Sequence, residues 1–314
     1  MTTNSKRIKR SIAILITIFM LMNIVAIFHA YKFTHFSDNE NERTKDPKQL
    51  SIGSKIRTLI FGINNPRPKN KSFPKNEFEV IHLKNGKDDI ECWSIMTENP
   101  KGTVVLFHGF SGEKSSLLDN ADIFRQLGYS TFLVDFTGSG GSSGNQTTIG
   151  FFEAEQVKTC YDYLIDNGIK NIYLFGTSMG SAAIMKAIND YGIEPKGIII
   201  ECPFGSMYKT VCARFKLMNA PAFPMAGLLV FWGGLQNGFW AFGHNPTKYA
   251  KAIKCPTLLL FGAKDEKVSQ QEIDEIFKNL SGQKELKVYQ EVGHENYLIK
   301  YKSEWTRDVE EFLR

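Results

Sequence analysis

One short motif in this sequence has the residue types and spacing of a nucleophile site, Gly-Thr-Ser-Met-Gly at 176–180. It follows an apolar run that ends at Phe175 and opens a segment of small residues. A serine on a sharp strand-to-helix turn exposes its hydroxyl at the edge of a sheet, and flanking glycines avoid the collisions that a Cβ would cause there. The other interpretation is a glycine-rich turn with an incidental serine. The strand–turn–helix context favours a nucleophilic Ser178.

A serine hydroxyl is a weak nucleophile at its ordinary pKa, so it needs a general base. His294 lies after an apolar run at 286–289 and just before the last helical segment, in a loop from which a base could reach Ser178. The remaining histidines lie in or near the amino-terminal apolar segment, in strands or in an apolar insertion: His29, His35, His82, His108 and His244. We therefore predict that His294 is the base. His108 is expected to shape its loop.

The imidazole of such a base is oriented by an acid, and Ser, Asp, His is a known chain order for the three groups. Asp265 follows the apolar run at 258–261 and precedes His294, so it is the predicted acid. Glu201, at the end of the preceding strand, is the alternative acid. Its other interpretation is a polar strand end that supports the following loop.

A site for acyl transfer must also stabilise an oxyanion. The strand that ends at His108 runs into a loop at 109–112, where one backbone N–H is expected. The residue after the nucleophile supplies the second N–H, at a helix N-terminus whose dipole favours negative charge. The predicted donors are therefore the backbone N–H groups of Phe110 and Met179.

The elements that must position these residues follow from the hydrophobic pattern. Apolar runs, each ended by a turn residue, occupy 104–107, 131–134, 172–175, 198–200 and 257–261. Segments with helical periodicity alternate with them at 117–127, 151–165, 182–191 and 298–312. This alternation predicts an α/β fold with a mostly parallel, doubly wound sheet. Two strand candidates at 78–83 and 90–96 have no helix between them and predict an antiparallel hairpin that opens the sheet.

One segment, at about 203–246, breaks this rhythm. It is rich in Phe, Trp, Met, Gly and Pro and carries few charges. It is too irregular for one strand–helix unit, so we predict a cap inserted over one end of the sheet. An apolar cap suits a hydrophobic acyl substrate, although its aromatic residues could equally pack on the body.

The amino-terminal region predicts a membrane anchor. Residues 11–28 contain 15 apolar residues among 18, and such a helix spans about 27 Å, close to the ~30 Å of hydrocarbon in a bilayer. Four cations precede this span within ten residues, against Lys32 and Arg43 in the fifteen that follow, which favours a cytoplasmic N-terminus and a body outside the cytoplasm. The alternatives are a cleaved signal, which would leave a secreted protein, and a buried core helix.

The predicted organisation is a basic flank at 1–10, a transmembrane signal-anchor helix at 11–31, a tether and lead-in at 32–77 and a catalytic domain at 78–314. The whole chain has 38 Lys and Arg against 33 Asp and Glu. No acid precedes Asp38, and that stretch holds five cations, so the remaining 33 cations balance the 33 acids. A neutral body gives no argument for nucleic-acid binding.

The cysteines give no sign of a metal site. The five of them are scattered without a C-x-x-C pair, which excludes a disulfide framework and a zinc site of the usual spacing and leaves one disulfide possible. We expect no metal or organic cofactor. The expected partners are a small acyl substrate and a membrane.

The ordered set of His-Gly-Phe at 108–110, the motif at 176–180, Asp265 and His294 resembles the α/β-hydrolase superfamily. Within it, the chain is similar to serine aminopeptidase S33-like and monoacylglycerol-lipase-like hydrolases. Asp-Phe-Thr-Gly-Ser-Gly-Gly-Ser at 135–142 resembles the D-x-R-G-x-G-x-S turn of that family, with Thr137 where the family usually has Arg. The resemblance covers 78–314 and implies the α/β-hydrolase fold and a serine-hydrolase reaction.

Together these patterns predict a membrane-anchored serine hydrolase that cleaves a carboxylic ester, such as a lipid or other apolar acyl ester, through an acyl-enzyme. The superfamily hosts esterases, lipases, thioesterases and peptidases, so the substrate class stays open. An S33-like peptidase is the first alternative. A catalytically inactive hydrolase-fold protein used for binding is the second.

Overall fold

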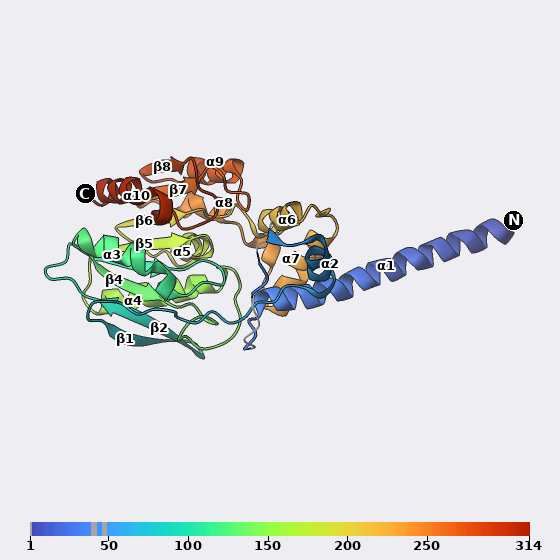
Figure 1. The fold of residues 1–314 in the computed structure, drawn as a ribbon, viewed down its shortest axis with the longest axis horizontal. Coiled ribbons are helices and arrows are strands. Elements are labelled where there is room, and N and C mark those ends of the chain that lie inside the picture. The colour runs from blue at the N-terminus through green and yellow to red at the C-terminus, as the bar shows by residue number, and fades with distance from the viewer. Residues whose placement is uncertain (1, 39–42, 46–48) are drawn as a thin grey trace.

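The structure is a computed structural model that describes residues 2–38, 43–45 and 49–314. Within these residues lies an eight-stranded sheet with strand order β1-β2-β4-β3-β5-β6-β7-β8 (Figure 1). The strands are β1 (Glu79–Asn85), β2 (Asp88–Ile95), β3 (Thr103–Phe107), β4 (Ser130–Val134), β5 (Ile172–Thr177), β6 (Gly197–Glu201), β7 (Thr257–Gly262) and β8 (Lys284–Tyr289). β2 pairs antiparallel with β1 and with β4, and every other neighbouring pair is parallel. The predicted mostly parallel sheet and its opening hairpin are confirmed.

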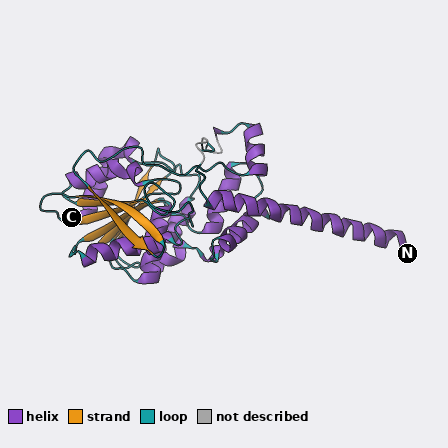
Figure 2. Cartoon of the chain, turned by 90° about the horizontal axis from the view of Figure 1, so that it is seen from below, coloured by secondary structure: helices purple, strands orange, loops and turns teal. Residues whose placement is uncertain are grey.

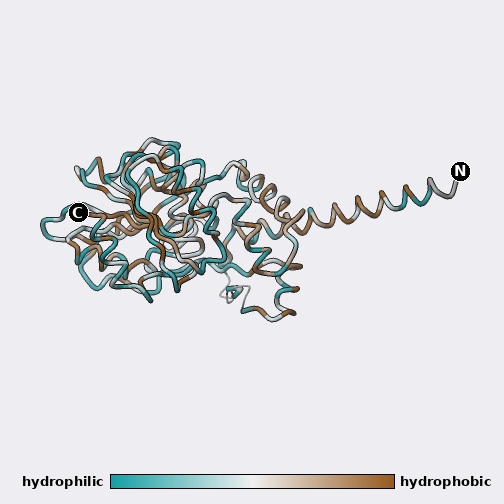
Figure 3. Tube along the Cα trace, turned by 90° about the horizontal axis from the view of Figure 1, so that it is seen from above, coloured by the Kyte–Doolittle hydropathy of each residue, from teal (hydrophilic) through white to brown (hydrophobic). Residues whose placement is uncertain are grey.

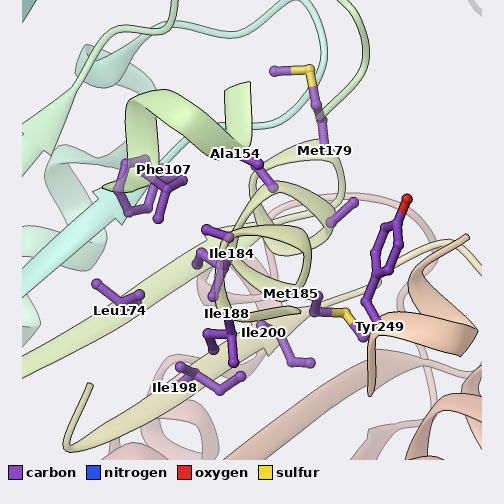
Figure 4. Packing of buried hydrophobic residues seen from close by; sticks show 14 of the residues in the cluster. Phe107, Ala154, Leu174, Met179, Ile184, Met185, Ile188, Ile198, Ile200 and Tyr249 are labelled. Atoms are coloured by element: carbon purple, nitrogen blue, oxygen red, sulfur yellow. The ribbon is translucent and has the colours of Figure 1, made fainter. Parts of the chain in front are cut away.

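Helices cover both faces of the sheet, as strands without a polar face require. Every residue of β3, β4, β6 and β7 is buried. One face packs against α4 (Glu153–Asp166), α5 (Met179–Tyr191), α8 (Pro246–Tyr249) and α9 (Gln270–Asn279), and the other against α3 (Leu118–Gln126) and α10 (Leu298–Leu313). Figure 2 shows the strands between these helices. In Figure 4, Ile184 and Ile188 of α5 lie beside Leu174, Ile198 and Ile200 of the sheet. The fold is therefore doubly wound.

Helix α9 has no counterpart among the predicted helices, although the sequence carries a start signal for it. The Ser269 side chain accepts a hydrogen bond from the backbone of Glu272, whose carboxylate accepts one from the backbone N–H of Ser269. This capping box satisfies two N–H groups that have no partner within the helix. Ile273 and Ile276 then bury one face of the helix against the core.

The amino-terminal helix α1 (Thr2–Thr34) is longer than the predicted anchor at 11–31. It contains a candidate membrane span, Lys6–Thr34, judged by length and composition. Its first part projects away from the body, and its last part lies along α7 (Met225–Gln236) (Figures 1 and 3). Trp232 Nε1 donates to Asn23 Oδ1 at 2.9 Å, and Ala26 and Ala30 are buried in this contact region. The end of α1 is thus part of the folded body.

The described residues between α1 and β1 form a short helix and a strap along the body. The helix, α2 (Ile52–Phe61), begins at a Ser51 cap. The strap is made of the described residues 35–38, 43–45 and 62–78. The buried side chains of Phe36 and Asn65 attach it to the body, and the backbone N–H of Phe36 donates to the Asn145 carbonyl. The predicted tether at 32–77 therefore includes packed segments. The boundaries of the tether and of the catalytic domain at 78–314 stay a prediction.

The insertion at 203–246 contains α6 (Met207–Leu217), α7 and a short 3₁₀ turn, Ala241–Gly243. Side chains of α6 and α7 face the same cavity as Phe110 and Ser111, which follow the carboxyl end of β3. The insertion therefore lies over the edge of the sheet where the parallel strands end. Ligands of open α/β sheets bind at this edge.

Candidate active site

Ser178 lies on a strained turn between β5 and α5. Its φ of +50° and ψ of −103° are a combination that non-glycine residues rarely adopt. A Cβ at Gly176 would come within 2.7 Å of the Gly180 backbone, and a Cβ at Gly180 would come within 2.3 Å of the carbonyl oxygen of Phe107. Both glycines of the motif are therefore required for strand, turn and helix to pack this closely. The Ser178 N–H donates to the carbonyl of Glu201 at 2.8 Å, which ties the turn to β6.

The structure brings Ser178, His294 and Asp265 together in one hydrogen-bonded row. His294 Nε2 lies 3.0 Å from Ser178 Oγ, and His294 Nδ1 lies 2.7 Å from Asp265 Oδ2. The Asp265 side chain is fully buried, while that of His294 keeps 18% of its surface exposed. The second carboxylate oxygen of Asp265 accepts hydrogen bonds from the backbone N–H groups of Lys267 and Val268. These bonds fix the carboxylate with one oxygen directed at the imidazole.

Glu201, the alternative acid, is held elsewhere. Trp305 Nε1 donates to its carboxylate at 2.6 Å, and the residue is 3% exposed. Burial raises the pKa of Glu201 to about 8, against the lowering effect of the bond from Trp305. Its backbone carbonyl accepts hydrogen bonds from Ser178 and from the Ser181 hydroxyl. The contacts described for Glu201 tie it to Trp305 and, through its carbonyl, to the turn that carries Ser178, rather than to the histidine.

Replacing Glu201 with glutamine is expected to weaken the pH dependence of stability. Between the ordinary carboxyl pKa of 4.5 and the folded pKa of about 8, the folded state keeps this proton and the unfolded state loses it. The free energy of unfolding therefore falls as pH rises, by up to about 1.4 kcal/mol per pH unit from this group. Urea unfolding in detergent measures the free energy of unfolding at pH 5.5 and at pH 8. We expect this free energy to fall more between the two pH values in wild type than in Glu201→Gln. Equal losses would contradict the assignment of a proton to Glu201.

The residues of the two predicted oxyanion donors both lie close to Ser178. Met179 is the first residue of α5, and the first N–H groups of a helix have no carbonyl partner within it. Phe110 follows β3 in a turn where the Gly112 N–H donates to the Gly109 carbonyl. A Cβ at Gly109 would come within 3.7 Å of Ser178 Cβ, so this loop lies directly beside the serine. The role of both N–H groups stays a prediction.

The other buried histidines are engaged away from the serine. The Phe136 N–H donates to His108 Nε2 at 3.1 Å, so Nδ1 carries the proton and donates to the Gly109 carbonyl. Burial lowers the pKa of His108, consistent with this neutral ring. His244 contacts the Ile149 carbonyl and the Tyr249 hydroxyl, and burial lowers its pKa to about 4. His108 therefore shapes the loop that carries Phe110.

The loop at 135–142 is held by charged groups that are not among the predicted site residues. Lys114 is fully buried, and its ammonium group contacts the carboxylates of Asp135 and Glu91. Arg67, from the strap, donates to the carbonyls of Ser142 and Gly144. In the sequence, only Asp135 gave a signal for this network, because it begins the turn at 135–142 that resembles the D-x-R-G-x-G-x-S motif. Lys114 and Arg67 lie in segments without a motif.

One cluster of potential metal ligands includes two of these site residues. Single ligand atoms of Cys202, Asp265 and His294 lie within 4.8 Å of one another. Asp265 and His294 already hydrogen-bond each other, and burial raises the pKa of the Cys202 thiol well above its usual value. Metal binding requires a thiolate, so this donor set fits an ion poorly. All five cysteines are free.

A cavity of about 450 Å³ adjoins the site. Phe110 and Ser111, from the loop beside the serine, and Lys267, two residues after Asp265, are among its lining residues, whereas Ser178 and His294 are not. Its other walls come from the end of α1, from α2, from the insertion, from residues 43–45, 50 and 63–65, and from Thr148 and Ile149. Four cations are among the lining residues: Arg43, Lys45, Arg214 and Lys267. This volume is within the range typical of small-molecule sites.

This sheet order, with a serine on the β5–α5 turn and a histidine after β8, is the α/β-hydrolase fold. Residues 98–232 match the family model described as serine aminopeptidase, S33. Among solved structures, an esterase of Pyrococcus furiosus has the same fold, with a TM-score of 0.67 and 23% identity over 80% of this chain and 96% of that one. The predicted superfamily resemblance is confirmed, and the chain is an α/β-hydrolase-fold protein.

Two curated proteins are similar in sequence. The uncharacterized protein YqkD of Bacillus subtilis is 22% identical over 229 residues, which cover 72% of this chain and 75% of that protein. The uncharacterized membrane protein YNL320W of Saccharomyces cerevisiae is 26% identical over 157 residues, which cover 48% of this chain and 54% of that protein.

Proposed function

We propose that the protein is a serine hydrolase whose catalytic triad is Ser178, His294 and Asp265. The observation that carries the proposal is the row of hydrogen bonds from Asp265 through His294 to Ser178, at 2.7 and 3.0 Å. A proton on Nδ1, facing the carboxylate, leaves Nε2 free to accept the proton of the serine hydroxyl. The strained turn that presents the serine at the edge of the sheet supports the same role.

In the proposed reaction, Ser178 Oγ attacks the substrate carbonyl while His294 takes its proton. The backbone N–H groups of Phe110 and Met179 stabilise the negative oxygen of the tetrahedral intermediate. His294 then gives the proton to the leaving alcohol, and an acyl-enzyme remains. Water then attacks the acyl carbonyl while His294 accepts its proton, and a second tetrahedral intermediate forms. The bond between the acyl carbon and Ser178 Oγ breaks, His294 returns the proton to Ser178 Oγ, and the carboxylic acid leaves.

A carboxylic ester is the substrate class that we favour. The shared fold with an esterase supports it, as does the largely apolar lining of the adjoining cavity. The second candidate is a peptidase, which the match to the serine aminopeptidase family favours. Both reactions proceed through the same triad, so the leaving group is what distinguishes them.

We further propose that α1 anchors the enzyme in a membrane, with its N-terminus in the cytoplasm and the catalytic domain outside. The candidate span and the similarity to a yeast membrane protein support anchoring, and the cation bias supports the orientation. The main alternative is cleavage of α1 as a signal peptide. The candidate cleavage positions are the small residues Ala26 and Ala30. Both alanines are buried against the body, so cleavage there would remove packed residues.

The test is covalent labelling of the purified, detergent-solubilised protein with a fluorophosphonate, followed by mass spectrometry of its peptides. We expect one phosphonylated residue, Ser178, with labelling blocked by prior denaturation. Esters of graded acyl length should then be hydrolysed faster than aminoacyl amides. Absence of labelling in the folded protein would refute the proposed mechanism, and faster amide cleavage would establish the peptidase instead.

A further inference from the structure

The cavity beside the active site has walls from parts of the chain that are distant in sequence. The end of α1 supplies His29, Ala30, Phe33 and Thr34, and α2 supplies Thr58 and Leu59. The insertion supplies apolar side chains of α6 and α7 and of the turn after them: Met207, Val211, Phe215, Leu217, Leu229, Val230 and Phe239. The active-site side contributes Phe110. The cavity therefore lies between the predicted oxyanion loop and the membrane-anchor helix.

Specific contacts hold α1 in place as a wall. Gln236 Nε2 donates to the Ile27 carbonyl at 3.0 Å, and Asn237 Nδ2 donates to Thr34 Oγ1 at 3.3 Å. The two helices also lie close together at Gly233 of α7, where a Cβ would be in ordinary van der Waals contact, at 3.9 Å, with that of Ala30. The helix is thus attached to the cap over its last turns.

Phe33 links this wall to the catalytic loop. Its ring stacks on that of Phe110 with centroids 4.6 Å apart and planes 7° from parallel. The guanidinium of Arg214, from α6, lies 5.2 Å from the centre of the same ring. Since the Phe110 N–H is a predicted oxyanion donor, the anchor helix contacts the residue next to the reacting carbonyl.

The chemistry of the lining favours a hydrocarbon chain over a peptide. Burying methylene groups in an apolar cavity stabilises a complex in proportion to the apolar surface removed from water. A substrate with a free amino terminus calls for a carboxylate partner, yet none of the described lining residues is Asp or Glu. The side chains that meet the cavity from α7 are aliphatic.

We propose that this cavity binds the alkyl chain of the acyl substrate and that the end of the membrane-anchor helix is one wall of the binding site. This inference rests on the function proposed above and adds the substrate class, an ester of a long unbranched acyl chain. The anchor then has two roles, since the segment that holds the protein at a bilayer also contacts the substrate.

A photoreactive alkyl probe tests the position of the chain. A fluorophosphonate bearing a twelve-carbon chain with a terminal diazirine first phosphonylates Ser178, and illumination then crosslinks the chain end. We expect crosslinks, mapped by mass spectrometry, in the peptides that contain 29–34, 211–217 or 229–234. Crosslinks confined to other parts of the protein or to detergent would overturn this inference while leaving the serine mechanism intact. Failure to label Ser178 would refute both.

Two pairs of variants test the walls. Leu229→Trp fills the cavity from α7, and we expect the ratio of kcat/KM for a dodecanoyl ester to that for an acetyl ester to fall at least tenfold. Phe33→Ala enlarges it from α1, and we expect the preferred chain to lengthen. The controls are Leu235→Trp and Phe28→Ala, at exposed positions on the same helices. The ratio corrects for a general loss of activity, and an unchanged ratio in both lining variants would contradict the inference.

Discussion

Replacing Ser178 with alanine is expected to lower kcat for ester hydrolysis by about 10⁴-fold or more, because the acyl-enzyme can no longer form. The oxyanion donors and the cavity would remain, so a small residual rate above that in water is expected. Initial rates with a p-nitrophenyl ester measure the change. Circular dichroism shows whether the variant is folded.

A matched serine variant makes this result specific. Ser281 lies in the loop before β8, and its hydroxyl donates an exposed hydrogen bond to the Lys251 carbonyl. Ser281→Ala removes this bond and should keep the wild-type rate. A folded Ser178→Ala protein with more than a tenth of wild-type activity would rule out Ser178 as the nucleophile. Inactive wild type that binds esters would instead favour the binding-protein alternative.

The acid provides the second large effect. Asp265→Asn is expected to lower kcat by about 10⁴-fold, since an amide can donate to His294 Nδ1 and so favour the tautomer with the proton on Nε2. That tautomer cannot accept the proton of Ser178. Rates across pH 6 to 9 measure the loss.

Glu201→Gln is the matched control, because both changes replace an acid by its amide. The pKa of about 8 keeps Glu201 mostly protonated at pH 7, and a glutamine carbonyl can still accept the hydrogen bond from Trp305. We therefore expect less than about a threefold change in kcat at pH 7. A large loss in Glu201→Gln with a small one in Asp265→Asn would reverse the assignment of the acid.

Much of the fold could be predicted because its signals are local. Buried parallel strands appear as apolar runs, and the glycines around Ser178 stand at fixed offsets from it because the turn is tight. Helix α9 was not predicted, although its signal is also local: the Ser269 cap and Glu272 three residues later. The two helices of the insertion, of which only α7 is apolar, were visible in the sequence only as an irregular composition.

The sequence by itself determined the type of sheet, the turn that carries Ser178 and the candidates for base and acid, since each depends on neighbours a few residues away. Only the tertiary structure decided which acid faces His294, because Glu201 ends β6, Asp265 follows β7, and even the nearer of them lies 29 positions from the histidine. It also decided that the end of the apolar helix belongs to the body. The bond between Asn23 and Trp232 spans 209 positions, and such contacts form only when the whole chain has packed.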